Sequence, residues 1–254
     1  MLDIVNNQHD HSHTAISEPP FLASAHFSDN KKHLLLAASG SVATIKIPSI
    51  ATSLSSHTSL SIIVLLTSSA SNFLRGQSPE QPHYSSLRQI PNVDGVFLDE
   101  EEWVLPWKRG NSILHIELRR WADVLLIAPL SANTLAKITG GFSDNLLTNV
   151  VRAWDTTGSL EARAAEGVQE NTEALRKRIL VAPAMNTAMW KHPITGRQIR
   201  VLEEEWGVKG GDEGGGWFEV LKPMEKELVC GDVGDGAMMD WKDIVKVVEE
   251  RLGL

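Results

Sequence analysis

The chain has 254 residues, 42% of them hydrophobic and 22% charged, and a formal net charge of −8. This composition predicts a globular protein with a substantial core rather than a disordered chain. No apolar run approaches the roughly 20 residues that span a bilayer, and no basic flank precedes an apolar block, so we expect neither a membrane protein nor a secreted one. The single cysteine excludes an internal disulfide framework and is typical of a reducing compartment, so we expect a cytoplasmic location. Half of the net charge lies in residues 1–30 and no long basic stripe follows, which argues against nucleic acid as a partner.

Residues 1–30 contain no Lys or Arg and no apolar periodicity, and they predict a disordered tail. We expect residues 31–254 to form a single domain. Two segments within it read as surface insertions: 155–178, which is rich in charges of both signs, and 210–216, which contains five glycines in seven positions. A His-rich run at 9–13 has the residue types of a metal site, but a solvated tail is the simpler interpretation.

Four continuous apolar runs predict buried strands at 33–38, 60–66, 123–129 and 178–183. Helical spacing predicts helices over 42–54, where Pro48 should end or kink the helix, over 113–121, and over 240–252 behind an Asp240 cap. Strands of this kind separated by helices indicate a three-layer α/β fold with a mostly parallel sheet covered on both faces. In such sheets ligands bind beyond the carboxyl ends of the strands.

Polar residues follow all four predicted strands, and after the second they form the turn Thr67, Ser68 and Ser69. Ser39, Gly40 and Ser41 form a tight turn that favours a phosphate at a helix start, although a purely steric role for the glycine is as consistent with the pattern. Ser131, Asn133 and Thr134 crowd another helix start, either as ligand contacts or as an elaborate cap. Asn186 follows the fourth strand and is suited to holding a carboxylate or amide, whereas its neighbours Met185, Met189 and Trp190 have core packing as their default role.

His115 and Cys230 are the two candidate reactive side chains. Leu114, Leu118 and Trp121 form a core-facing stripe, and His115 borders it, as either a core residue or an acid–base group. Cys230 precedes three glycines within six residues, which predicts a mobile loop that presents a thiol, whereas an isolated cysteine is ordinarily a small buried hydrophobe.

Four motifs occur together in one order: LHIELRRWAD at 114–123, PLSANT at 129–134, PAMNTAMW at 183–190 and CGDVGDGAM at 230–238. In these motifs the chain resembles the homo-oligomeric flavin-containing cysteine decarboxylases, over about 33–154 and 178–240. The resemblance implies a flavodoxin-like or Rossmann-like fold, bound FMN, and homotrimers with FMN near the subunit interfaces.

The resemblance also implies a role for each matching position. His115 and Cys230 would be catalytic, with Cys230 the proton donor on a flap. Asn186 and Met189 would bind the substrate. Lys46, one turn into the first predicted helix, is a candidate contact for the substrate phosphate. The implied FMN contacts are Ser39, Gly40, Ser41, Thr67, Ser68, Ser69, Ser131, Ala132, Asn133, Thr134 and Ala184.

The implied reaction is the decarboxylation of 4'-phosphopantothenoyl-L-cysteine to 4'-phosphopantetheine in coenzyme A biosynthesis. Loss of CO2 from an ordinary cysteine carboxylate leaves an unstabilised carbanion, so an electron sink is required. Oxidation of the substrate thiol by the flavin would let sulfur delocalise the charge. The main alternative is a non-catalytic relative that regulates a phosphatase or serves in mixed trimers. Decarboxylation of peptide C-terminal cysteines and flavin prenyl transfer are further rivals, and the presence of His115, Asn186 and Cys230 favours the enzyme.

Overall fold

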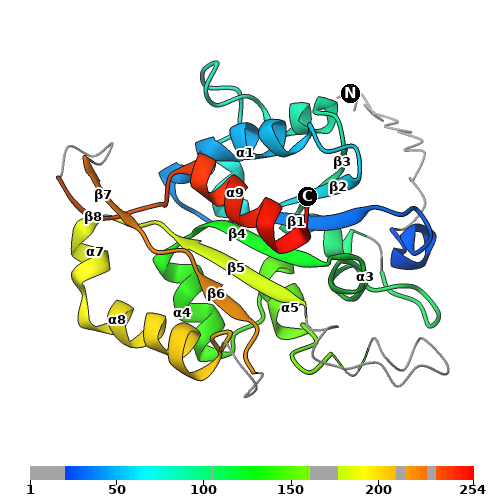
Figure 1. Ribbon diagram of the computed structural model, residues 1–254. Helices are drawn as coiled ribbons and strands as arrows, with labels where there is room; N and C mark the ends of the chain where they lie inside the picture. The colour runs from blue at the N-terminus through cyan, green and yellow to red at the C-terminus, as the bar shows by residue number, and fades with distance from the viewer. Residues whose placement is uncertain (1–20, 105, 159, 161–176, 210–214, 228–232) are drawn as a thin grey trace, which may run out of the picture.

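The computed structural model describes residues 21–254 apart from 105, 159, 161–176, 210–214 and 228–232. Within these residues a parallel sheet of six strands has the order β3-β2-β1-β4-β5-β6. The strands are β1 (Lys32–Ala38), β2 (Leu60–Leu66), β3 (Val93–Leu98), β4 (Val124–Leu130), β5 (Arg178–Pro183) and β6 (Phe218–Val220). An antiparallel hairpin of β7 (Met224–Glu227) and β8 (Val233–Ala237) stands beside the sheet (Figure 1).

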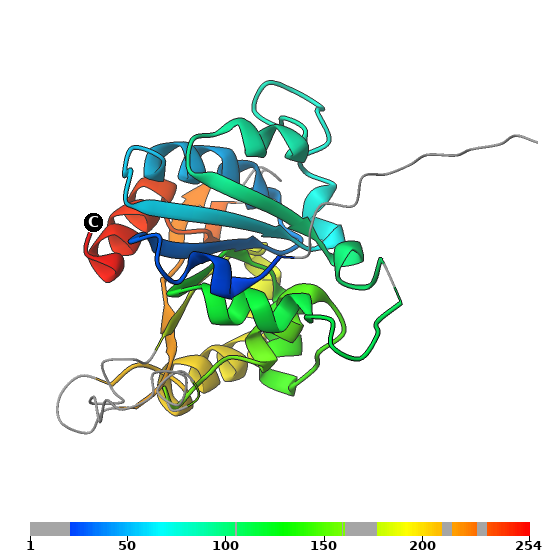
Figure 2. The ribbon, with the colours of Figure 1, turned by 90° about the vertical axis from the view of Figure 1, so that its right-hand side faces the viewer.

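Helices cover both faces of this sheet, and Figure 2 shows the sheet between the two helical layers. The α-helices of the described residues are α1 (Ile47–Leu54), α2 (Ser68–Ser71), α3 (Leu114–Trp121), α4 (Ala132–Gly140), α5 (Leu146–Arg152), α7 (Thr187–Lys191), α8 (Pro193–Arg200) and α9 (Trp241–Leu252). The 3-10 helices are η1 (Ala23–His26), η2 (Val42–Lys46), η3 (Tyr84–Gln89) and η4 (Asp99–Trp103), and η5 (Val201–Glu205) is a π-helix. The predicted three-layer α/β class is therefore confirmed.

Alternation along β1 divides the core into two halves, because successive side chains of a strand point to opposite faces. Leu34 and Leu36 pack with α1 and α9, whereas Leu35 and Ala37 pack with α3, α4 and α5. Every residue of β2 and β4 is buried, as expected for strands covered on both faces. Among the described residues, no helix combines the length and apolar character needed to cross a membrane.

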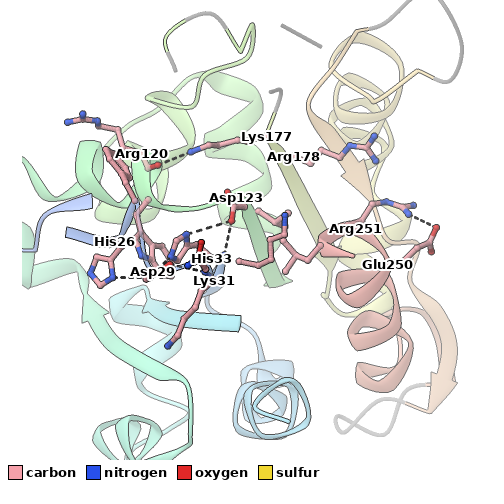
Figure 3. Close-up of a pocket in the computed structure, with 16 residues that line it drawn as sticks. His26, Asp29, Lys31, His33, Arg120, Asp123, Lys177, Arg178, Glu250 and Arg251 are labelled. Atoms are coloured by element: carbon pink, nitrogen blue, oxygen red, sulfur yellow. Dashed lines mark hydrogen bonds and ion pairs between the residues drawn. The ribbon is translucent and has the colours of Figure 1, made fainter. Parts of the chain in front are cut away.

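The strand order places a topological switch between β1 and β4, because the chain runs outward through β2 and β3 and then returns to the other side of β1. In open sheets of this kind, ligands bind at the carboxyl ends of the strands on either side of such a switch point. At the opposite, N-terminal edge of the sheet, a hollow of about 1030 Å³ lies between the start of β1, the end of α3 and the end of α9 (Figure 3).

The four predicted strands match β1, β2, β4 and β5 to within one residue at either end, and Asp240 caps α9 by accepting from the Lys242 backbone N–H at 2.9 Å. The expectation for Pro48 was wrong in position: α1 begins at Ile47, so the proline occupies its first turn, where a missing N–H costs nothing. Strands β3, β6, β7 and β8 were not predicted.

The boundary of the predicted tail also needs correction. Residues 21–30 belong to the packed body: Ala23 is fully buried, and its backbone N–H donates to Glu117 Oε2 of α3 at 2.8 Å. Residues 1–20 and most of the two predicted insertions lie outside the described residues. The ends of the first insertion are close together, since Trp154 Nε1 donates to the Lys177 carbonyl at 3.0 Å.

Candidate active site

The loops after β1 and β4 are tied together at the switch point. Ser39 donates from both its backbone N–H and its hydroxyl to the Pro129 carbonyl, each at 3.0 Å. The Ser39 hydroxyl also accepts from the Ser131 backbone N–H at 2.8 Å. Both serine side chains are buried, and their hydroxyls form hydrogen bonds within the chain itself.

The loops after β1 and β2 approach each other at Gly40. A Cβ atom at Gly40 would lie 2.6 Å from Ser69 Cβ, a separation that real Cβ contacts do not adopt, so only glycine fits without a shift. Thr67 is buried and caps α2, accepting from the Ala70 N–H at 3.2 Å. Ser68 and Ser69, by contrast, are exposed.

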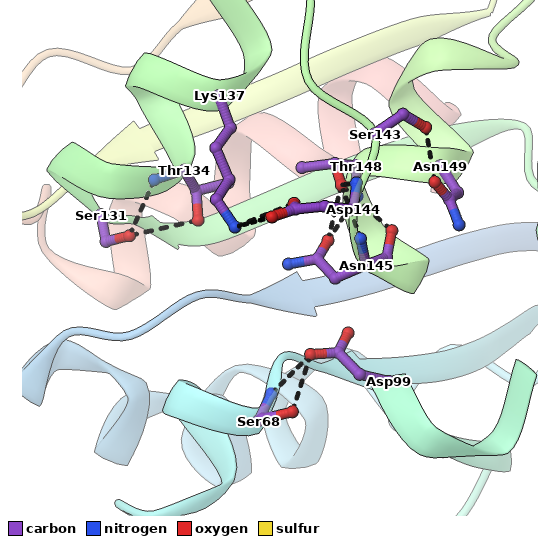
Figure 4. Close-up of polar contacts among 10 residues, drawn as sticks. All are labelled: Ser68, Asp99, Ser131, Thr134, Lys137, Ser143, Asp144, Asn145, Thr148 and Asn149. Atoms are coloured by element: carbon purple, nitrogen blue, oxygen red, sulfur yellow. Dashed lines mark hydrogen bonds and ion pairs between the residues drawn. The ribbon is translucent and has the colours of Figure 1, made fainter.

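At the start of α4, likewise, some polar side chains are buried and others are exposed; Figure 4 shows Ser131 and Thr134. Ser131 accepts from the Thr134 backbone N–H at 3.3 Å and lies 3.2 Å from the Thr134 hydroxyl, and both side chains are buried. Asn133 is exposed and Ala132 is half-buried. The interpretation as a cap therefore describes Ser131 and Thr134, and Asn133 alone of the three presents its side chain to solvent.

His115 lies in the first turn of α3, whose Leu118 and Trp121 are buried in the core. Its Nδ1 forms a hydrogen bond with Glu102 Oε1 of η4, and the other oxygen of Glu102 accepts from Asn149 Nδ2 of α5 at 2.7 Å. The Glu102 side chain is 1% exposed and that of His115 is 20% exposed. A buried carboxylate thus holds one edge of an imidazole that remains accessible.

The charge state of Glu102 decides the tautomer of His115. Burial alone would raise the pKa of Glu102, but hydrogen bonds from His115 and Asn149 outweigh burial and lower the pKa below its ordinary value. The carboxylate is therefore ionised near neutral pH and only accepts hydrogen bonds. His115 must donate from Nδ1, which leaves Nε2 as the ring nitrogen that is free to exchange a proton in the neutral form.

The short helix η4 connects this histidine to the loop after β2. At its start, Asp99 Oδ2 accepts from the Ser68 backbone N–H at 2.7 Å and from the Ser68 hydroxyl at 3.0 Å (Figure 4). Burial raises the pKa of Asp99 above its ordinary value, against the lowering effect of these hydrogen bonds. Asp99 Oδ1 is buried and has no hydrogen-bond partner among the described residues.

The loop after β5 forms a separate part of the carboxyl-terminal edge of the sheet. Asn186 caps α7, its Oδ1 accepting from the Met189 N–H at 2.8 Å, so its amide NH₂ is the group left for a ligand. Asn186 and Met189 are exposed, whereas Ala184 is buried. The default of core packing is thus wrong for Met189, whose side chain projects from a helix of only five residues.

Cys230 lies outside the described residues, but the hairpin strands on either side of it are described. The base of the hairpin is fixed to the loop after β5, where the Met185 N–H donates to the Gly236 carbonyl at 3.0 Å. Gly236 has φ +113°, and a Cβ there would lie 2.7 Å from the Met185 carbonyl oxygen. The base of the β7–β8 hairpin is therefore fixed next to the residue that precedes Asn186.

The structure thus brings together most of the predicted cofactor loops and leaves some predicted residues apart. Among the described residues, no hydrogen bond connects His115 or Asn186 to the serines of these loops, and Lys46, at the end of η2, joins none of these contacts. The sequence interpretation missed Glu102, Asn149 and Asp99. The acidic run 99–102 is evident in the sequence, but the sequence does not indicate which of its carboxylates are buried.

These residues fit a flat, polar ligand such as a flavin nucleotide. The close approach at Gly40 leaves a cradle between two loops, Asp99 Oδ1 is a buried acceptor without a partner among the described residues, and Ser68, Ser69 and Asn133 supply exposed hydrogen-bonding groups nearby.

Comparison with known proteins identifies the family of the chain. The flavoprotein family model matches residues 22–253. A probable phosphopantothenoylcysteine decarboxylase of Arabidopsis thaliana is 41% identical over 210 residues, which cover 83% of each chain. Coenzyme A biosynthesis protein 3 of Saccharomyces cerevisiae is 37% identical over 88% of this chain, and the match spans only 34% of the length of that protein.

Two solved structures have the same fold. A PPC decarboxylase mutant complexed with pantothenoylaminoethenethiol superposes with a TM-score of 0.63 at 38% identity, covering 87% of this chain and 97% of the other. The FMN binding protein AtHal3 gives a TM-score of 0.63 at 39% identity, over 87% and 96% of the two chains. The chain belongs to the flavoprotein family and, within it, to the family of the phosphopantothenoylcysteine decarboxylases.

Proposed function

We propose that this protein binds FMN and decarboxylates 4'-phosphopantothenoyl-L-cysteine to 4'-phosphopantetheine and CO2. The observation that carries the proposal is the accessible His115 ring, oriented by the buried Glu102 carboxylate on the helix that also contacts the Ser68 loop. The names of the relatives support the substrate, and the FMN-binding neighbour supports the cofactor.

The reaction needs an electron sink, because direct loss of CO2 would leave charge on an ordinary saturated carbon. When bound, FMN supplies that sink by accepting two electrons from the substrate's thiol carbon and returning them later, so that the net reaction is redox-neutral. On this proposal the buried members of the predicted set, Ser39, Thr67, Ser131, Thr134 and Ala184, support the cofactor site from behind. The remaining members face the cofactor: Gly40, Ser41, Ser68, Ser69, Ala132 and Asn133.

The role proposed for His115 is to take the proton of the substrate thiol. An ordinary cysteine thiol has a pKa of about 8.5 and is mostly protonated near neutral pH, so oxidation at sulfur is easier once a base has removed that proton. With Nδ1 held by Glu102, His115 accepts at Nε2 without turning the ring. The resulting imidazolium is paired with the buried carboxylate.

Substrate binding and delivery of the final proton are assigned chiefly to the loop after β5 and to the β7–β8 hairpin. The free amide of Asn186 donates to the substrate carboxylate or amide, Met189 packs against the pantothenoyl arm, and Lys46 pairs with the phosphate. Cys230, carried by the hairpin anchored beside Asn186, donates the proton that completes the product. Closure of the hairpin would exclude water during these steps.

We also propose a cytoplasmic homotrimer in which the packed body forms one domain. Two large apolar side chains that directly follow Glu102 in the chain, Trp103 and Val104, are more than half exposed. Trp103 is the last residue of η4, next to the buried Glu102, so a partner subunit that covers this surface would also cover the His115 side of the site. Sedimentation of the FMN-loaded protein measures the subunit number directly.

The test of the reaction uses the Cys230→Ser variant with 4'-phosphopantothenoyl-L-cysteine as substrate. We expect the variant to keep FMN and release CO2 while accumulating an oxidised thiol species two hydrogens short of 4'-phosphopantetheine in the mass spectrum. Full turnover to 4'-phosphopantetheine would contradict the role of Cys230. Absence of CO2 release by the wild-type protein would contradict the proposed function itself.

A further inference from the structure

We propose a binding site for a divalent transition-metal ion of the Zn²⁺ type, formed by His26, Asp29 and His33 at the N-terminal edge of the sheet. The site lies at the opposite end of β1 from the candidate active site and is independent of the proposed decarboxylation. It would fasten the segment 21–30 to the start of β1.

The positions of the donor atoms match the needs of a tetrahedral ion. His26 Nδ1 lies 3.6 Å and His33 Nε2 lies 3.1 Å from the same oxygen, Asp29 Oδ2. Zn²⁺ bonds of about 2.0–2.1 Å place neighbouring ligand atoms about 3.4 Å apart, between the two observed distances. All three donor atoms lie within 4.8 Å of one another. Two imidazoles and one carboxylate suit Zn²⁺ and its neighbours rather than Mg²⁺ or Ca²⁺.

The surroundings hold these side chains in place. The second ring nitrogen of His33, Nδ1, lies 3.7 Å from Asp123 Oδ2, which also accepts from the His33 backbone N–H at 2.8 Å (Figure 3). A carboxylate behind a ligating histidine is the usual outer-shell partner in metal sites. The other oxygen of Asp29 accepts from the Lys31 N–H at 2.9 Å, which fixes the carboxylate and leaves Oδ2 facing the rings.

Aromatic packing restricts both imidazoles. The His33 ring lies 4.7 Å from the Trp121 ring, centroid to centroid, and the His26 ring stacks on Phe21 at 5.6 Å. The His33 side chain is 10% exposed and that of His26 is 31% exposed, so the site is buried on one side and open on the other. The open side faces the hollow at this edge of the sheet, which has room for water as a fourth ligand.

The test measures Zn²⁺ binding by titration calorimetry on the FMN-loaded full chain. Because His9, His11 and His13 could bind Zn²⁺ independently, all three are first replaced by alanine, and this variant is the reference protein. We expect one Zn²⁺ per chain in the reference protein. His26→Ala and Asp29→Asn should each weaken binding at least tenfold.

His57→Ala is the matched control. His57 pairs with a single carboxylate, Glu249, at 2.9 Å and is 28% exposed, but no second histidine is nearby in the described part of the chain. We expect this control to leave the affinity unchanged. Zn²⁺ should also raise the melting temperature of the reference protein and not that of folded His26→Ala or Asp29→Asn. No binding by the reference protein, or equal binding by these two variants, would overturn the proposal.

Discussion

Replacing Glu102 with glutamine removes the negative charge behind His115 and keeps the shape of the side chain. In the wild-type protein both carboxylate oxygens accept, one from His115 and one from Asn149. A glutamine offers one acceptor and one NH₂ group, so it cannot accept both hydrogen bonds in the same way. His115 then either loses its partner or adopts the tautomer in which Nε2 carries the proton.

The expected loss follows from the burial of the pair. Glu102 is 1% exposed, so solvent does not replace the lost interaction. A hydrogen bond to a charged group contributes about 1.5–3 kcal/mol. If this orientation is needed only when His115 takes the substrate proton, the barrier rises by a similar amount and kcat falls roughly 10- to 100-fold. KM should change less than kcat.

The assay is CO2 release from 4'-phosphopantothenoyl-L-cysteine by FMN-loaded protein. Glu101→Gln is the matched control, because Glu101 is an exposed neighbour on the same helix whose carboxylate accepts from the Leu98 N–H instead. A double variant separates positioning from folding: adding Glu102→Gln to His115→Asn should cost almost nothing further. A kcat within twofold of wild type for folded, yellow Glu102→Gln would refute the role assigned to Glu102.

Three further predictions test other parts of the structure. Gly40→Ala should weaken FMN binding, because the new Cβ would lie 2.6 Å from Ser69 Cβ. Gly196→Ala is the control and should leave FMN binding unchanged, because its Cβ would lie 3.9 Å from the nearest atom. Equal FMN affinity of the two variants in a fluorescence titration would contradict the role of the close approach at Gly40. The lowered pKa of Glu102 means that its ionised form stabilises the fold above the unfolded pKa of about 4.3 and that this contribution is lost as pH falls through the folded-state pKa. Urea unfolding should therefore give Glu102→Gln a flatter acid limb than wild type, and parallel limbs would count against the ionised pair. The raised pKa of Asp99 means that its ionised form destabilises the fold. Asp99→Asn should therefore be more stable than wild type near pH 7, and this difference in stability should shrink as the pH falls. A stability difference that grows on acidification would contradict a burial cost at Asp99.

The layered fold was predictable because its strands are covered on both faces. Runs such as Leu60–Leu66 are apolar at every position, and this pattern has few other interpretations in a chain of alternating strands and helices. β3 was missed because Asp94 and Gly95 interrupt its apolar pattern, and β6 because it spans only three residues. The strand order was not predicted either, since it depends on long-range pairing that no local pattern contains.

The candidate site was predictable where a motif follows a strand and less so where distant segments meet. Ser39 and Ser131 were expected at one edge, and the structure joins them directly. Their buried hydroxyls were not foreseen, because a serine in a turn has the same local pattern whether it faces a ligand or the core. Glu102 and Asn149 are separated from His115 by 13 and 34 positions, so only the packing of η4 and α5 against α3 brings them together.

The segment 21–30 illustrates the same limit. Its composition resembles that of the preceding tail, yet Ala23 is buried and His26 packs against Trp121 of α3 and His33 of β1. The segment is held by contacts with Glu117 and Trp121, about 90 residues away in the chain. No apolar periodicity within the segment itself predicts this packing.

The central claim is that bound FMN is what allows the carbon–carbon bond to break. The most direct measurement strips the protein of flavin, then follows CO2 release from 4'-phosphopantothenoyl-L-cysteine as FMN is added back in known amounts. We predict no release from the colourless protein and a rate that rises in proportion to bound FMN up to one per chain. Sustained CO2 release by the flavin-free protein, or none after full reconstitution, would contradict the account.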